Sequence, residues 1–334
     1  MSESLGTGLR ALALVAALVI PLAFLSDYNL FRLTLVASYA LALLGLNLLM
    51  GFGGQISLGH GAFLAVGSYT TGILVASFDV PYWATTPCAA LLCGLLGFLV
   101  GWPALRLRGP YLALVTLALA TAVPQGLKHP ALETWTGGVQ GILLSKPDAP
   151  WGLPLNPDQW LYLVAFLLDC MAFLLVARLM RGRIGRAIVA VRDQATAAEA
   201  MGINIASIKT RTFALSAMLA GIAGSISALA IEFVAPDSFS VFLSITLFVG
   251  AVVGGAASIA GAIPGAVFIV AVPSLANILS KSAPGIAYGA ILILCLYALP
   301  SGVAGLFRRT RKRGRPRVDI RVAQAKPEET KHAA

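Results

Sequence analysis

Long apolar runs separated by short polar segments are the feature that most limits how this 334-residue chain can fold. An α-helix needs about 20 apolar residues to cross a hydrocarbon core of about 30 Å, and it satisfies its backbone groups internally. Strands of a membrane barrel would instead alternate apolar and polar residues over about 10 positions. The sequence therefore predicts an all-α polytopic membrane protein with about ten transmembrane helices. The predicted spans are residues 9–25, 30–50, 57–77, 82–101, 109–127, 159–180, 210–231, 240–257, 261–280 and 285–300.

Composition favours the same fold class, because 58% of the residues are hydrophobic and only 11% are charged. A soluble domain carries about 25% charged residues. The first apolar run has a second interpretation, since Arg10 precedes it as a basic residue precedes the core of a secretory signal peptide. We retain it as a span, because Ala23-Phe24-Leu25 is a poor small-x-small cleavage site.

The positions of lysine and arginine predict the orientation, because positive charges next to spans stay preferentially in the cytoplasm. When both termini are placed in the cytoplasm, all but four of the 24 Lys and Arg residues lie on the cytoplasmic side. The four exceptions are Arg32, Lys128, Lys146 and Lys281. This bias also supports an even number of spans.

The predicted organisation is a membrane domain followed by a tail. The membrane domain covers residues 1–306, with an external loop at 128–158 and a cytoplasmic loop at 181–209. The external loop, rich in Pro and Trp, either packs over the outer mouth or is simply anchored at the interface by its indoles. Residues 307–334 are basic and form a predicted disordered cytoplasmic tail, which fixes topology or binds anionic lipid headgroups. Because no aromatic residues interleave its charges, nucleic acid is not an expected partner.

A glycine-rich segment at residues 51–63 joins the second and third predicted spans. Its five glycines each disfavour a helix by about 1 kcal/mol relative to alanine. One interpretation is a broken helix whose backbone lines a substrate path, as in transporters, and the other is a tight, closely packed turn. The candidate residues for a substrate path or helix break are Gly53, Gly54, Gln55, Ser57, Gly59 and His60.

Two further features lie inside the predicted spans. A second glycine-rich tract at 250–265 is expected to bring helices into close contact. Asp169 is the clearest charged residue within a span, and it either lines a path or accepts a hydrogen bond from a neighbouring helix.

The segment from Arg178 to Arg211 is a polar island between apolar runs. Residues 193–201 are good helix formers, and Gly202 or Asn204 is suited to ending that helix. Ala197, Ala198, Met201 and Ile205 would share an apolar face, with Arg192, Asp193 and Glu199 at its polar rim. Such a short amphipathic helix suits a groove on a cytoplasmic partner. The alternative, a helix lying on the bilayer, gains little from a face made mostly of alanine.

Several enzyme motifs are absent from the sequence. It has no Gly-x-x-x-x-Gly-Lys-Ser/Thr phosphate loop, no His-Glu-x-x-His metal motif and no Gly-x-Ser-x-Gly nucleophile elbow. The four cysteines all fall in apolar runs without metal-site spacing. We therefore expect no enzymatic activity, no metal site and no cofactor on this chain.

Two motifs in this order carry a family resemblance. Residues 53–63 read Gly-Gly-Gln-Ile-Ser-Leu-Gly-His-Gly-Ala-Phe, and Ala-Val-Arg-Asp at 190–193 is followed by Ala-Ala-Glu-Ala-Met-Gly-Ile-Asn at 197–204. Over roughly residues 10–305 the chain resembles the permeases of branched-chain amino acid ABC transporters, of the LivM type. ABC permeases share a coupling pattern Glu-Ala-Ala-x-x-x-Gly. Aligned on Gly202, it matches Ala197 and Ala198, but Thr196 replaces the glutamate.

The resemblance implies partners and a function. It implies a coupling loop docked on two cytoplasmic ATPase subunits that bind ATP and magnesium, a second permease, and an external solute-binding protein. The expected function is import of leucine, isoleucine or valine across the bacterial inner membrane. Two alternatives remain open: an ABC permease for urea, short amides or a sugar, and an ion-driven secondary transporter. The latter would need intramembrane carboxylates, for which Asp169 alone is thin support.

Overall fold

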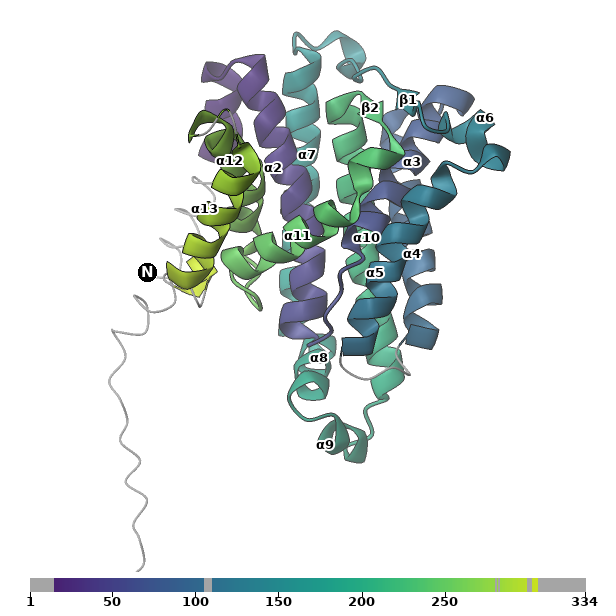
Figure 1. Cartoon of the computed structure of the whole chain (residues 1–334), viewed down its shortest axis with the longest axis vertical. Coiled ribbons are helices and arrows are strands. Elements are labelled where there is room, and N and C mark those ends of the chain that lie inside the picture. Colours follow the sequence, from purple (N-terminus) through teal and green to yellow (C-terminus); the bar gives the residue numbers. More distant parts are fainter. Residues whose placement is uncertain (1–14, 105–109, 280, 282, 299–301, 306–334) are drawn as a thin grey trace, which may run out of the picture.

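A computed structural model describes residues 15–104, 110–279, 281, 283–298 and 302–305, and it is almost entirely helical (Figure 1). The predicted tail at 307–334 and the start of the first predicted span lie outside the described residues. The helices are Val15–Phe24, α2 (Asp27–Leu46), the π-helical turn η1 (Asn47–Phe52), α3 (His60–Phe78), α4 (Tyr82–Ala104), α5 (Pro110–Leu127), α6 (Glu133–Thr136), α7 (Pro157–Arg181), α8 (Arg183–Asp193), α9 (Ala195–Ala200), α10 (Ile205–Ile231), α11 (Val241–Gly254), α12 (Ala262–Leu279) and α13 (Pro284–Ala298).

Six helices of the described part are long and apolar enough to cross a membrane. The number rises to seven if Tyr111–Leu127 and Pro130–Thr136, which meet at a 64° bend, form one span. Three predicted spans contain shorter helices, namely Val15–Phe24, α11 and α13. α11 stops early because Gly255 adopts φ +115°, which takes the chain out of the helix. The chain is thus a multi-pass helical protein, and the number ten stays a prediction.

α10 is the central helix of the bundle and packs against α2, α3 and α4 (Figure 1). Small residues allow this close approach, because the backbone of Gly67 on α3 lies directly against that of Gly221 on α10. Two serine hydroxyl groups also bind the backbone of α10. Ser38 Oγ on α2 donates to Ala223 O at 2.7 Å, and Ser68 Oγ on α3 donates to Gly224 O at 2.8 Å. α12 packs on α2 and is followed outward by α13.

The outer helices expose large apolar side chains. Leu91 on α4 is 67% exposed, and Leu167 and Leu174 on α7 are more than half exposed. A water-soluble monomer rarely leaves such extended apolar surface uncovered. These faces therefore suit contact with lipid or with another membrane subunit.

The connection at residues 128–158 folds back over one end of the bundle, at the top of Figure 1. Its strand β1 (Ile142–Leu143) pairs antiparallel with β2 (Phe233–Val234), which follows α10. Lys146 lies 3.0 Å from Asp158 and 3.7 Å from Glu232. The loop thus packs on this end of the bundle, and its place relative to an outer mouth or a membrane interface stays a prediction. The two short strands are an addition to the predicted all-α fold.

The α3–α10 contact makes a test of this packing possible. A methyl group added at Gly67 would overlap the backbone of Gly221, whereas one added at Gly126 on α5 meets no atom within 4 Å. We expect Gly67→Ala to destabilise the protein by about 1–3 kcal/mol through overpacking, and Gly126→Ala to leave stability unchanged or to raise it by up to about 1 kcal/mol. Thermal unfolding of both variants in detergent measures this. Equal melting temperatures would contradict the close α3–α10 contact.

Candidate functional site

The polar island folds into two short helices rather than the single predicted one. α8 ends at Asp193, Gln194 takes an extended conformation (φ −153°, ψ 90°), and α9 covers only Ala195–Ala200. Met201 and Gly202 then form a turn in which Gly202 has φ +81°. The predicted helix at 193–201 is therefore wrong at its start, because the backbone breaks at Gln194. The predicted face that joined Ala197 to Ile205 is also divided, since Ile205 begins α10.

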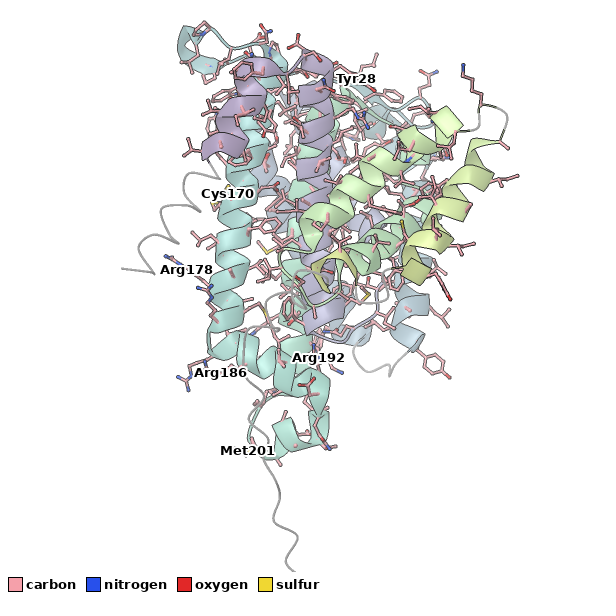
Figure 2. All side chains as sticks on the ribbon, turned by 90° about the vertical axis from the view of Figure 1, so that its left-hand side faces the viewer. Tyr28, Cys170, Arg178, Arg186, Arg192 and Met201 are labelled. Carbon is pink, nitrogen blue, oxygen red and sulfur yellow. The ribbon has the colours of Figure 1, made fainter. Side chains whose placement is uncertain are left out.

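The predicted docking residues differ widely in exposure. Met201 is 84% exposed and lies at the tip of the loop (Figure 2). Ala197, Glu199 and Gly202 are also exposed, whereas Ala198 is only 5% exposed and packs within this chain. The surface available to a partner is therefore centred on Met201 and Gly202.

Arg192 connects the island to the glycine-rich segment. Its Nη1 donates to the carbonyl oxygen of Gly51 at 2.8 Å, across 141 residues of sequence. Its Nε and Nη2 both lie 2.8 Å from Asp193 Oδ1, which orients the guanidinium group. Its aliphatic stem packs on Gly54, at a position where a side chain would collide with it. In Figure 2 Arg192 lies beside the lower end of α2. The structure thus brings together two sites that the sequence treats separately.

The π-helical turn η1, which contains Gly51, ends at Phe52. η1 widens the last turn after α2, and the N–H groups of Gly53, Gly54 and Gln55 donate back to carbonyls of residues 48–50 at 3.0–3.1 Å. Gly54 has φ +66°, a conformation that disfavours other residues. The chain then runs without helix until His60, where α3 begins. In Figure 1 this interruption runs upward between α2 and α5.

The second glycine-rich tract also meets this interruption. Asn47 Nδ2 donates to Ser258 O at 3.1 Å, and Gly51 lies directly against the backbone of Ala257. Ala257 itself has φ +60°. We call the meeting point of Gly51, Gly54, Arg192, Ala257 and Ser258 the glycine junction. Three segments far apart in sequence therefore converge on one helix end.

His60 and Ser57 form a hydrogen-bonded chain at the start of α3. Ser216 Oγ donates to Gly45 O at 2.6 Å, so it accepts a hydrogen bond from His60 Nε2, also at 2.6 Å. His60 Nδ1 then accepts from Ser57 Oγ at 3.2 Å. These directions assign the neutral tautomer with hydrogen on Nε2. Both ring nitrogens are therefore hydrogen-bonded, and the bond to Ser216 joins α3 to α10.

The remaining predicted residues lie close to this chain or apart from it. Gly59 packs against the backbone of Thr116 on α5, and Gln55 is 5% exposed with no partner for its Oε1 among the described residues. Asp169 lies on α7 and joins none of the contacts above. Asn47, Ser216 and Ser244 were not predicted from the sequence. Ser244 Oγ accepts a hydrogen bond from Gly61 N at 3.1 Å. Asn47 offered a signal as a polar residue inside an apolar run, whereas the serines offered none.

Comparison with known proteins agrees with this membrane architecture. A family model described as "Branched-chain amino acid transport system / permease component" matches residues 29–299. The high-affinity branched-chain amino acid transport system permease proteins LivM of Salmonella typhimurium strain LT2 and Escherichia coli K12 are each 32% identical, over 96% of this chain and 79% of theirs. The corresponding permease protein LivH of S. typhimurium is 25% identical, over 81% of this chain and 92% of its own.

No solved structure shows significant similarity to the chain. The family model and the LivM proteins nevertheless cover nearly the whole of it. The chain therefore belongs to the family of branched-chain amino acid transport system permease components, and so to transport proteins rather than enzymes.

Proposed function

We propose that this chain is one of two permease subunits of an ATP-binding cassette importer in the bacterial inner membrane. Together with a homologous second permease it forms the path for leucine, isoleucine and valine. The proposal is supported by the names of its relatives, which are permeases of branched-chain amino acid transport and are of two kinds, LivM and LivH. The exposed apolar faces of the outer helices suit a second membrane subunit.

Two ATPase subunits bind at the end of the bundle that carries α8 and α9, and this end faces the cytoplasm. The basic residues at this end support the orientation, since positive charges next to spans favour the cytoplasm. ATP and magnesium bind on those subunits in this proposal, which the absence of a phosphate loop from the sequence supports. A solute-binding protein delivers the amino acid to the opposite end, where residues 128–158 lie.

The contact between Arg192 and Gly51 is the observation that carries the proposed mechanism. The exposed turn at Met201 and Gly202 receives the movement of the ATPase, and α8 is joined to α9 through Gln194. Displacement of α8 moves Arg192 and therefore the carbonyl of Gly51, at the helix end before the interruption. The island thus acts directly on the segment proposed to line the substrate path, and nucleotide shifts the balance between its two states.

Replacing Arg192 by Met tests this link, because methionine keeps an aliphatic stem over Gly54 but removes the donor to Gly51 O. Losing a charge-assisted bond to a buried carbonyl costs about 1.5–3 kcal/mol. We expect transport in reconstituted vesicles to fall about tenfold or more while ATP hydrolysis continues. Arg178→Gln, which removes an exposed arginine of α7, is the matched control. An unchanged ratio of transport to hydrolysis in Arg192→Met would reject the link.

Gly202 tests the docking turn. Its φ of +81° disfavours a β-branched side chain, although a Cβ there would meet no atom within 4 Å. We expect Gly202→Val to introduce about 1–3 kcal/mol of backbone strain, reshape the turn and uncouple ATP hydrolysis from transport without affecting insertion. Gly202→Asn is the control, since asparagine tolerates positive φ and should stay coupled. If the valine variant transports normally per ATP hydrolysed, the turn does not transmit the movement.

The substrate class can be tested on the assembled complex with its solute-binding protein. We expect leucine, isoleucine and valine to stimulate ATP hydrolysis, and urea and acetamide to leave it at the basal rate. The measurement is phosphate release in proteoliposomes at saturating solute. Stimulation by an amide but by none of the three amino acids would assign the chain to a different ABC importer.

A further inference from the structure

An open groove of about 600 Å³ lies between α8 and the first turns of α10. Three arginines line it, Arg183 and Arg186 from α8 and Arg211 from α10, and all three are exposed. They lie at the end where the ATPase subunits are proposed to bind, but the proposed link through Arg192 and the turn at Gly202 does not involve them. The ligand of this groove can be inferred without knowing which solute the protein transports.

Its positive charge is not neutralised by nearby carboxylates. Within the described ranges, no ion pair involves Arg183, Arg186 or Arg211, and the one acidic partner bound on α8 is Asp193, which pairs with Arg192. Arg186 Nη1 makes a single long contact of 3.4 Å, to the backbone oxygen of Arg181. Three guanidinium groups beside one groove predict an anionic ligand, because arginine binds phosphate through paired N–H groups.

The depth of the groove points to the membrane surface. At 1.5 Å per residue, Arg211 lies about 30 Å along α10 from Ile231, and Arg181 lies about 36 Å along α7 from Pro157. The hydrocarbon core of a bilayer is about 30 Å thick. The arginines at this end of both helices are therefore at the level of the lipid headgroups.

The groove also has an apolar wall. Ile184, 52% exposed, and Ile208 line it together with the arginines, and Ser207 on the first turn of α10 adds a hydroxyl group. The opposite face of α8, with Gly185, Ile188 and Val191, is buried against the bundle. α8 is thus an amphipathic helix that rests on the protein through one face and leaves basic and apolar groups together on the other. An acidic protein segment would match the charges alone. The apolar Ile184 beside the arginines favours a ligand that carries both a phosphate and acyl carbons.

We propose that this groove binds the headgroup phosphate of an anionic phospholipid. Arg183, Arg186 and Arg211 hold the phosphate, and Ile184 and Ile208 contact the glycerol backbone and the first acyl carbons. Basic pockets between transmembrane helices on the cytoplasmic side are suited to such headgroups. The bound lipid would fix α8, which carries Arg192, relative to α10, which follows the docking turn.

Native mass spectrometry of the full-length chain, titrated with phosphatidylglycerol or phosphatidylcholine of the same acyl length, tests the proposal. We expect wild-type protein to retain phosphatidylglycerol in preference to phosphatidylcholine. The double variant Arg183→Gln/Arg211→Gln should bind phosphatidylglycerol roughly tenfold or more weakly, since each nearby cation contributes to lipid affinity. Arg178→Gln/Arg181→Gln removes two exposed arginines of α7 at the same level and should keep most of the affinity. If the double variant does not assemble, the single variants Arg183→Gln and Arg211→Gln replace it.

Three results would overturn the proposal. Equal losses in the two double variants would mean that phosphatidylglycerol senses only the general charge of this end. Displacement of the lipid by millimolar inorganic phosphate would mean that the groove is a site for a free anion. Unchanged lipid binding by Arg183→Gln/Arg211→Gln, together with failure of this variant to co-purify with the ATPase subunits, would make the groove a protein-docking surface.

Discussion

Backbone-to-backbone contact around α10 is the constraint on which the rest of this structure depends. In a bilayer the lipid tails are as apolar as the helices, so burial of leucine does not drive helices together. Close packing and hydrogen bonds across the contact must do so. Gly67 and Gly221 permit that approach, and Ser38 and Ser68 use it to reach carbonyls on α10. Because the central helix is held on three sides, its neighbours tolerate interruptions that an isolated helix could not.

The interruption after η1 illustrates this tolerance. Each backbone group freed at a helix end in hydrocarbon needs an internal partner. Here Arg192 satisfies Gly51 O, Asn47 satisfies Ser258 O, and Ser244 accepts from Gly61 N. These contacts connect the interruption to the polar island, the second glycine tract and α11. Arg192 therefore has a precise structural task, which is to bind the carbonyl oxygen of Gly51 at the end of η1.

The sequence predicts what depends on local pattern. Apolar runs located the helices, and the glycines at 51–63 marked the interruption, because both effects act on neighbouring residues. It could not pair Arg192 with Gly51 or Ser216 with His60, since those contacts join residues 141 and 156 positions apart. The break at Gln194 was also not predicted, because good helix formers lie on both sides of it. The chain changes direction there before it returns to α10. The β1–β2 pairing could not be predicted either, because two residues per strand are too few to show a strand pattern.

The strands and ion pairs at one end of α10 have a mechanical consequence. Glu232, directly after α10, accepts from Leu144 N and lies near Lys146, so the outer loop is attached to the helix. The other end of the same 27-residue helix leads into the turn at Gly202. Between them, Gly221 and Gly224 press on α3 near the middle. Because α10 is one continuous helix in closest contact with α3 near its middle, a tilt about that contact would move its two ends in opposite directions.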